Sequence, residues 1–179
     1  MTTMTELVIR KATEIDFDAV GEVTHDAYAH DYDDLSDEYR ENLRHPERLV
    51  AEYQTWVAER DGRLVGVISI RHAELHEPGW IEPDELYFRL LAVSPAARGT
   101  GIGQALIEHA FDVARERGAV SVVMNSGPQM KGAHALYRKL GFIEPADRQR
   151  FVDDGGVRIR LHTFSRYVAP APVSRANAG

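Results

Sequence analysis

The stretch Arg98-Gly99-Thr100-Gly101-Ile102-Gly103 lies between a short apolar segment and a long amphipathic one, and it decides the fold. Glycine has no Cβ, so three glycines in six residues let the backbone turn tightly and come close to a ligand. The amphipathic segment predicts a helix whose N-terminus offers unpaired N–H groups and the positive end of its dipole. The stretch therefore predicts an anion site, most simply for a phosphate or a pyrophosphate.

The spacing of these glycines excludes two common phosphate-binding motifs. A P-loop has a Lys directly after its last glycine, whereas Gly103 is followed by Gln104. The dinucleotide pattern G-x-G-x-x-G/A fails as well, whether it starts at Gly99 or at Gly101. The pattern that fits is Arg/Gln-x-x-Gly-x-Gly/Ala, matched by Arg98, Gly101 and Gly103. This resembles the acetyl-CoA signature of the GNAT superfamily of N-acetyltransferases.

Composition limits the class of protein. The 179 residues suit one domain, which we place at residues 1–168, and the small-residue stretch 169–179 is expected to be a disordered tail. A formal net charge of −7 argues against binding to nucleic acid or to anionic membranes. The absence of cysteine excludes thiolate nucleophiles and cysteine-ligated metals, and no metal site is predicted. There is neither a signal-peptide layout nor an apolar run near the ~20 residues that cross a bilayer, so we expect a cytoplasmic protein.

Hydrophobic periodicity predicts alternating strands and helices. Strands are expected at residues 7–10, 56–60, 64–70, 85–93, 120–124, 142–143 and 157–167. Helices are expected at 15–28, from 102 to about 117 and at 130–140, and a further short helix is expected to end near residue 44. The strand at 85–93, the helix from 102 and the strand at 120–124 form a βαβ unit, so these two strands should be parallel. The predicted fold class is α/β with a mixed sheet.

Two further segments extend the resemblance to the GNAT superfamily. The segment Leu91–Pro95 looks like the family's strand before the glycine loop. The family signature A-x-x-L-Y-x-x-x-G-F is matched by Ala133, Leu136, Tyr137, Gly141 and Phe142. The resemblance spans residues 7 to 167 and implies a mixed sheet in which the parallel strand pair splays apart, flanked by helices.

The resemblance implies that acetyl-CoA, as co-substrate, lies between the splayed strands. The backbone of Leu91, Ala92 and Val93 would pair with the pantetheine arm. The pyrophosphate would be held by backbone N–H groups of Arg98, Gly99, Thr100, Gly101, Ile102, Gly103 and Gln104. Many relatives carry a Glu at the end of the next strand, where this chain has Asn125, which cannot take up a proton but would orient substrate or cofactor.

Direct attack of an amine on the thioester needs a general acid and a general base. Tyr137 is the candidate acid, because a phenol with a pKa of about 10 can protonate a thiolate whose parent thiol has a pKa of about 8.5. Core packing is the alternative role for this tyrosine. Glu85 is the candidate base, with a solvated carboxylate at a strand end as its alternative and Glu82 and His72 as rivals.

The sequence thus predicts transfer of an acetyl group to a primary amine on a small molecule, a peptide N-terminus or a lysine. A non-catalytic acyl-CoA sensor on the same fold is the first alternative, and a dinucleotide-binding α/β protein the second. The acidic segment 31–38, with Tyr28, Tyr32 and Tyr39, falls where the family builds its acceptor-side wall, although a solvated charge run is the alternative. The acceptor and the oligomeric state, a homodimer included, stay open.

Overall fold

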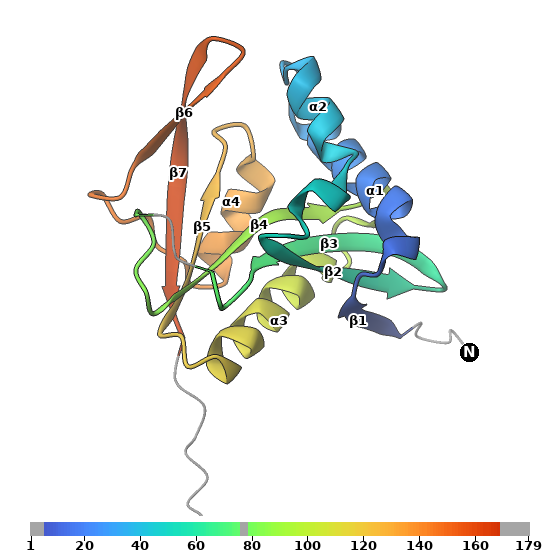
Figure 1. The fold of residues 1–179 in the computed structure, drawn as a ribbon, viewed down its shortest axis with the longest axis horizontal. Coiled ribbons are helices and arrows are strands. Elements are labelled where there is room, and N and C mark those ends of the chain that lie inside the picture. The colour runs from blue at the N-terminus through green and yellow to red at the C-terminus, as the bar shows by residue number, and fades with distance from the viewer. Residues whose placement is uncertain (1–5, 76–78, 169–179) are drawn as a thin grey trace, which may run out of the picture.

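The computed structural model describes residues 6–75 and 79–168, so the expected tail at 169–179 lies outside the described residues. Its sheet has seven strands in the order β1-β2-β3-β4-β5-β7-β6 (Figure 1). The strands are β1 (Leu7–Lys11), β2 (Tyr53–Arg60), β3 (Arg63–Arg71), β4 (Glu85–Val93), β5 (Ser121–Ser126), β6 (Arg150–Asp154) and β7 (Val157–Tyr167). The α-helices are α1 (Phe17–Asp31), α2 (Asp37–Leu43), α3 (Ile102–Glu116) and α4 (Lys131–Lys139).

The pair β4 and β5 is parallel, as predicted, and all other strand pairs in the sheet are antiparallel. The parallel register covers three residues of each strand and ends where Tyr87 faces Val123. Beyond it β4 continues to Val93 without β5 beside it, and Leu90 has a positive φ of 54° within this stretch. The two halves of the sheet therefore diverge, as Figure 1 shows. This confirms the predicted mixed sheet with a splayed parallel pair.

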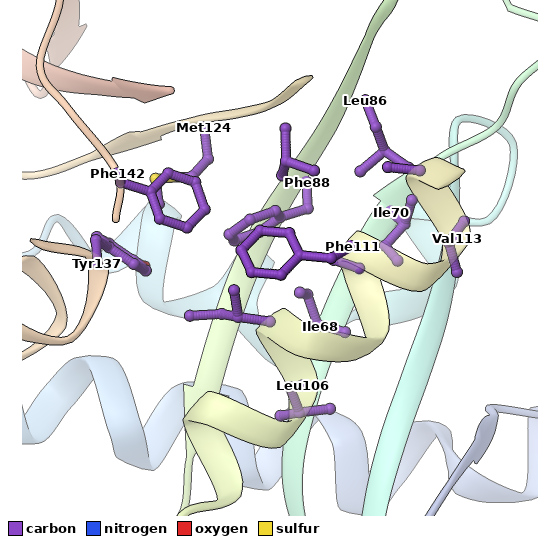
Figure 2. Close-up of a cluster of buried hydrophobic side chains, with 14 of the residues drawn as sticks. Ile68, Ile70, Leu86, Phe88, Leu106, Phe111, Val113, Met124, Tyr137 and Phe142 are labelled. Atoms are coloured by element: carbon purple, nitrogen blue, oxygen red, sulfur yellow. The ribbon is translucent and has the colours of Figure 1, made fainter. Parts of the chain in front are cut away.

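Alternating side chains of the central strands serve opposite faces of the sheet. Ala58 and Ile68 belong to the main core, which α3 covers, whereas Val57 and Val67 pack with Val20 of α1. Figure 2 shows the main core, with side chains of α3 over those of β3 and β4 and with Tyr137 at its far end. Within the described residues no helix is both long enough and apolar enough to span a membrane.

One predicted strand is absent in its expected form. Residues 142–143 make a single bridge between Ile143 and Ser165, and the strand that forms a hairpin with β7 is β6. Ile143 exchanges both backbone hydrogen bonds with Ser165 at 2.9 Å. Pro145, two residues on, has no N–H to continue such a ladder, so the pairing stops and resumes only at Arg150.

Candidate active site

Two adjoining cavities open where β4 and β5 separate. The first, about 420 Å³, is called here the glycine-loop cavity; it is lined by residues 91–93, 97–99, 101–104, 130, 132 and 133, with Ala27, Asp31, Leu136 and Lys139. The second, about 360 Å³, is called the tyrosine cavity; it is lined by residues 87–91, 125–127 and 152–154, with Tyr28, Tyr32, Leu35, Tyr39, Met130, Tyr137, Arg150, Ile159 and Leu161. Leu91 and Met130 line both, so the cavities meet at these two residues.

The N-terminus of α3 faces the glycine-loop cavity with free backbone donors. Gly101 caps the helix in the left-handed conformation with a φ of 84°, and it has no side chain to accept from the first turn. Within the described chain no acceptor is found for the N–H groups of Ile102, Gly103 and Gln104. Unpaired N–H groups at the positive end of a helix form an anion site, so the local geometry fits the predicted pyrophosphate cradle.

The side chains of the glycine loop fasten the loop itself. The Arg98 guanidinium donates to both carboxylate oxygens of Asp31, at 2.7 and 3.1 Å, and to the carbonyl of Ala27 at 3.2 Å. Burial would raise the pKa of Asp31, but the hydrogen bonds from Arg98 and His30 together outweigh it and hold that pKa below its usual range. The Thr100 hydroxyl donates to the Ala97 carbonyl at 2.6 Å. The backbone is therefore the part of the loop that remains available to an anion.

The C-terminal half of β4 presents a backbone edge to the gap. Ala92 and Val93 pair with Val67 and Gly66 of β3 on one edge, whereas pairing with β5 ended at Tyr87. An extended chain in the gap would meet this unpaired edge, as predicted for the pantetheine arm. Helices α3 and α4 also come close here, because a Cβ on Gly103 would lie 3.0 Å from a methyl group of Leu136.

Tyr137 lines the tyrosine cavity from α4. It is 4% exposed, and its ring packs against Phe142 and Phe164 at centroid distances of 5.7 and 5.2 Å. Burial raises its pKa well above the usual value of a tyrosine, so the phenol stays protonated at neutral pH. This position is compatible with both roles weighed for Tyr137, general acid and core packing.

Glu85 lies at the N-terminal end of β4 and does not line either cavity. Its carboxylate accepts from Arg148 at 2.6 and 2.8 Å and from the Glu82 N–H at 3.0 Å. Burial would raise the pKa of Glu85, but these hydrogen bonds bring it below its usual range. The rival His72 is also absent from both linings and interacts with the Val50 carbonyl at 2.9 Å. The geometry thus gives Glu85 the role of an ion-pair partner.

The end of β5 brings a serine and a histidine together, which the sequence analysis missed. Ser126 lines the tyrosine cavity, and its Oγ lies 3.1 Å from Nε2 of His134 on α4. Burial lowers the pKa of His134, so its imidazole is neutral at neutral pH and can accept the serine proton. The neighbouring Asn125 accepts from the Thr163 hydroxyl at 2.8 Å and also lines the cavity. The signal in the sequence was that Ser126 comes just after a predicted strand and that His134, eight residues later, lies in the next predicted helix.

The segment after α1 lines part of the tyrosine cavity through Tyr32 and Leu35. The Tyr32 hydroxyl packs so tightly on Gly127 that no Cβ would fit there, and Gln129 donates to Asp34 at 2.9 Å. The tyrosines predicted for the acceptor wall, Tyr28, Tyr32 and Tyr39, all line this cavity. Among the described residues no cluster of three or more His, Asp or Glu side chains is placed to hold a metal ion.

A model of the acetyltransferase (GNAT) family matches residues 17–142, which is more than half of the chain. The chain belongs to the GNAT acetyltransferase family. The match includes the glycine loop and the helix that carries Tyr137. The resemblance inferred from the two signatures is thereby confirmed at the level of the family.

Curated relatives match about half of the chain. The chain is 36% identical to mouse N-acetyltransferase 8 over 55% of its own length and 41% of that protein. It is 36% identical to streptothricin acetyltransferase of Streptomyces lavendulae over 51% of its length and 46% of that protein. The matches thus span less than half of these relatives.

Solved structures match over nearly the whole chain and identify the fold. The ribosomal-protein-S18-alanine N-acetyltransferase of Escherichia coli has a TM-score of 0.68 at 19% identity, covering 94% of this chain and 98% of that one. YncA of Salmonella typhimurium, solved with acetyl-CoA, has a TM-score of 0.64 at 22% identity, covering 96% and 99%. A bound acetyl-CoA in an acetyltransferase of this fold agrees with the predicted co-substrate.

Proposed function

We propose that this protein transfers the acetyl group of acetyl-CoA to a primary amine by direct attack in a ternary complex. The observation that carries the proposal is the meeting of two cavities at Leu91 and Met130. One cavity is built of backbone donors and suits a phosphorylated carrier, and the other is built of side chains and suits a second molecule. A transfer between two ligands needs such a junction, because their reacting atoms must approach to about 3–3.5 Å.

Acetyl-CoA would occupy the glycine-loop cavity. The N–H groups at the start of α3 support a pyrophosphate there, and the free edge of Leu91, Ala92 and Val93 supports the pantetheine arm. We place the thioester at the junction, because a carrier that follows both features leads from the glycine loop toward Leu91. Lys139 at the rim of the cavity adds one positive charge for the cofactor.

In the reaction the amine nitrogen attacks the thioester carbonyl carbon, the new C–N bond forms and the C–S bond breaks. The leaving thiolate takes a proton from Tyr137, whose buried phenol stays protonated at neutral pH. The resulting phenolate recovers its proton from solvent after the products leave. A positioned general acid contributes roughly 10²–10⁴-fold to such a rate.

The amine must also lose a proton, and two candidate acceptors differ in their surroundings. Glu85 is engaged by Arg148, and its lowered pKa makes it a weaker base. Ser126 lines the cavity of the acceptor, and His134 behind it is neutral and within hydrogen-bonding distance. We favour a relay in which the amine proton passes to Ser126 while the serine proton passes to Nε2 of His134.

A direct assay tests the proposal. The purified protein is mixed with acetyl-CoA and a panel of primary amines, and thiol release is measured together with a mass increase of the amine by one acetyl group. We expect both signals with at least one class of amine and their loss in Tyr137→Phe. Binding of acetyl-CoA by calorimetry without release of thiol over the whole panel would instead identify the acyl-CoA sensor.

The proposal extends to location and assembly. We place the protein in the cytoplasm, where acetyl-CoA is available. A homodimer is the assembly to test for. Sedimentation at micromolar concentration distinguishes the monomer of 20.1 kDa from a dimer.

A further inference from the structure

Arg89 places a half-buried guanidinium in the wall of the tyrosine cavity. The loop arginines Arg98 and Arg148 hold Asp31 and Glu85 at 2.7 and 2.6 Å. Within residues 6–75 and 79–168, Arg89 makes no such ion pair. Its partners are the Tyr39 hydroxyl and the face of Tyr53, whose centroid lies 5.6 Å away. The cation is thus held by neutral aromatic groups.

A cation that is partly removed from water without an anion destabilises the fold. The chain does not lack anions, since 28 Asp and Glu side chains give it a net charge of −7. Tyr39 and Tyr53, called here the tyrosine cage, instead hold the guanidinium of Arg89 in place. Some of its N–H donors are therefore left without a carboxylate partner. An anionic group that enters the cavity would supply the missing charge.

The same cavity also carries negative charge. Asp153 and Asp154 of β6 line it, and Asp154 accepts from the Ser36 hydroxyl at 2.6 Å. The second lining arginine, Arg150, stacks on Trp80 at 4.3 Å from the ring centroid. A cavity with fixed groups of both signs suits a ligand that carries both an ammonium group and an anion.

We propose that the amine acceptor carries its own carboxylate, as an α-amino acid or a short-chain amino acid does, and that Arg89 binds this carboxylate. This inference rests on the proposed function. Arg89 precedes Leu91 by two residues, at most about 7 Å along a strand, so the carboxylate would lie only a few bonds from the amine at the junction. A guanidinium fork matches a carboxylate in shape and in its single charge.

The size of the cavity agrees with a small acceptor. Its volume of about 360 Å³ lies at the lower end of the roughly 300–1,000 Å³ of ligand sites. The contact of Tyr32 with Gly127 and the hydrogen bond from Gln129 to Asp34 tie the segment after α1 to the loop after β5 beside this cavity.

The test compares acceptors that differ only in the carboxylate. For each common amino acid, three acceptors are compared at saturating acetyl-CoA: the free acid, its primary amide and its decarboxylated amine. The value of kcat/KM for each acceptor is measured by thiol release. We expect the free acid of the best side chain to exceed its amide on the order of 100-fold, because a charge-assisted bidentate contact is lost in the amide. A phosphorylated amine serves as a further anion.

The variant Arg89→Gln gives the second arm of the test. It should lower kcat/KM for the free acid on the order of 100-fold, mainly through KM, while kcat/KM for the amide changes less than about threefold. The Kd of acetyl-CoA should not change. The matched control is Arg71→Gln, because Arg71 lies over the same Tyr53 ring but does not line the tyrosine cavity.

Each outcome decides one of the two proposals. Equal rates with acids and amides, a preference for the phosphorylated amine, or an equal loss with acid and amide in Arg89→Gln would overturn the role of the carboxylate while acetyl transfer stands. The absence of acetylation with every compound would overturn both. Because the ratio of acid to amide is measured on the unaltered protein, the test does not depend on the variant folding.

Discussion

The two cavities differ in how their polar groups are assembled. The glycine-loop cavity takes its donors from the backbone of one short segment, residues 91–104, and from the first turn of α3. The tyrosine cavity collects side chains from α1, α2, β4, β5, α4, β6 and β7, which are separated by more than 130 residues in the sequence. A site made of local backbone is robust to sequence change, whereas a dispersed side-chain site can change its ligand without changing the fold.

Removal of the Tyr137 hydroxyl tests the tyrosine cavity at the proposed place of reaction and has the largest expected effect on activity. Tyr137→Phe should lower kcat by roughly 10²–10⁴-fold, because the leaving thiolate loses its proton donor. The Kd of acetyl-CoA should stay the same, since the ring and its contacts with Phe142 and Phe164 remain. Steady-state kinetics with calorimetry checks this. The control is Tyr53→Phe, a buried tyrosine outside both cavities, and equal losses in the two variants would contradict the role of Tyr137.

A side chain at Gly101 tests the local backbone site. Gly101→Leu should weaken acetyl-CoA binding on the order of 100-fold, because about two hydrogen bonds to a charged group are lost, each contributing about 1.5 kcal/mol at this exposed loop. Calorimetry measures the Kd.

The matched control for this variant is Gly118→Leu at the other end of α3. Gly118 has a φ of 72° beside the 84° of Gly101, and a Cβ at either position meets nothing within 4 Å. Both variants carry a similar backbone strain of about 1–2 kcal/mol, so a comparable loss of melting temperature is expected in each. If Gly118→Leu weakens binding as much as Gly101→Leu, strain rather than the cradle explains the effect.

Replacement of His134, the proposed acceptor of the amine proton, should have a smaller effect on kcat/KM and should also change its pH dependence. His134→Phe should lower kcat/KM about 10–100-fold, because Ser126 loses its proton acceptor. Since burial holds the pKa of His134 below its usual 6.5, the unaltered enzyme should lose activity only as the pH falls below that value, when the imidazole is protonated. The pH profile of kcat/KM should lose this acid limb in the variant.

The same experiment on Glu85→Gln separates the two candidate bases. This variant should keep most of its activity but lower the free energy of unfolding by about 1–3 kcal/mol at pH 7, because Arg148 loses a charged partner. The folded pKa of Glu85 is depressed, so this stabilisation is present above about pH 4.3 and is lost as the pH falls. A 100-fold loss of activity with unchanged stability would instead identify Glu85 as the base.

Arg98 gives the smallest expected effect, and it sharpens the role of the backbone in the glycine-loop cavity. Arg98→Gln should weaken acetyl-CoA binding less than tenfold, because its guanidinium already holds Asp31. The unfolding free energy should fall by about 0.5–1 kcal/mol, as for other partly exposed ion pairs. Asp31 has a depressed folded pKa, so the difference between the variant and the unaltered protein should be complete above about pH 4 and should decrease as the pH falls from there toward the folded pKa of Asp31. Chemical denaturation at pH 7 and pH 3.5 measures it, and a loss of binding above 100-fold would place the Arg98 side chain on the phosphate.

Much of the fold could be predicted because its signals are local. The turn after β2, the glycines at 99–103 and the apolar period of α3 each specify their own element. The expected strand at 142–143 was wrong because Pro145 interrupts the ladder, which the apolar pair Phe142-Ile143 did not indicate. Periodicity describes burial along the chain but does not describe which hydrogen bonds a neighbour can complete.

In the candidate site, too, the features set by local sequence could be predicted, whereas those that need tertiary contacts could not. The glycine cradle follows from six consecutive residues, because glycine conformations and helix N-termini act over one turn of chain. The partners of Glu85, the contact of Ser126 with His134 and the place of Arg89 in a cage of tyrosines depend on segments that meet only after folding. The sequence by itself therefore determined the family and the fold class, and it predicted the glycine loop as the site for the cofactor. Only the tertiary structure decided which charged and polar side chains line the tyrosine cavity, because such contacts join residues that no local pattern connects.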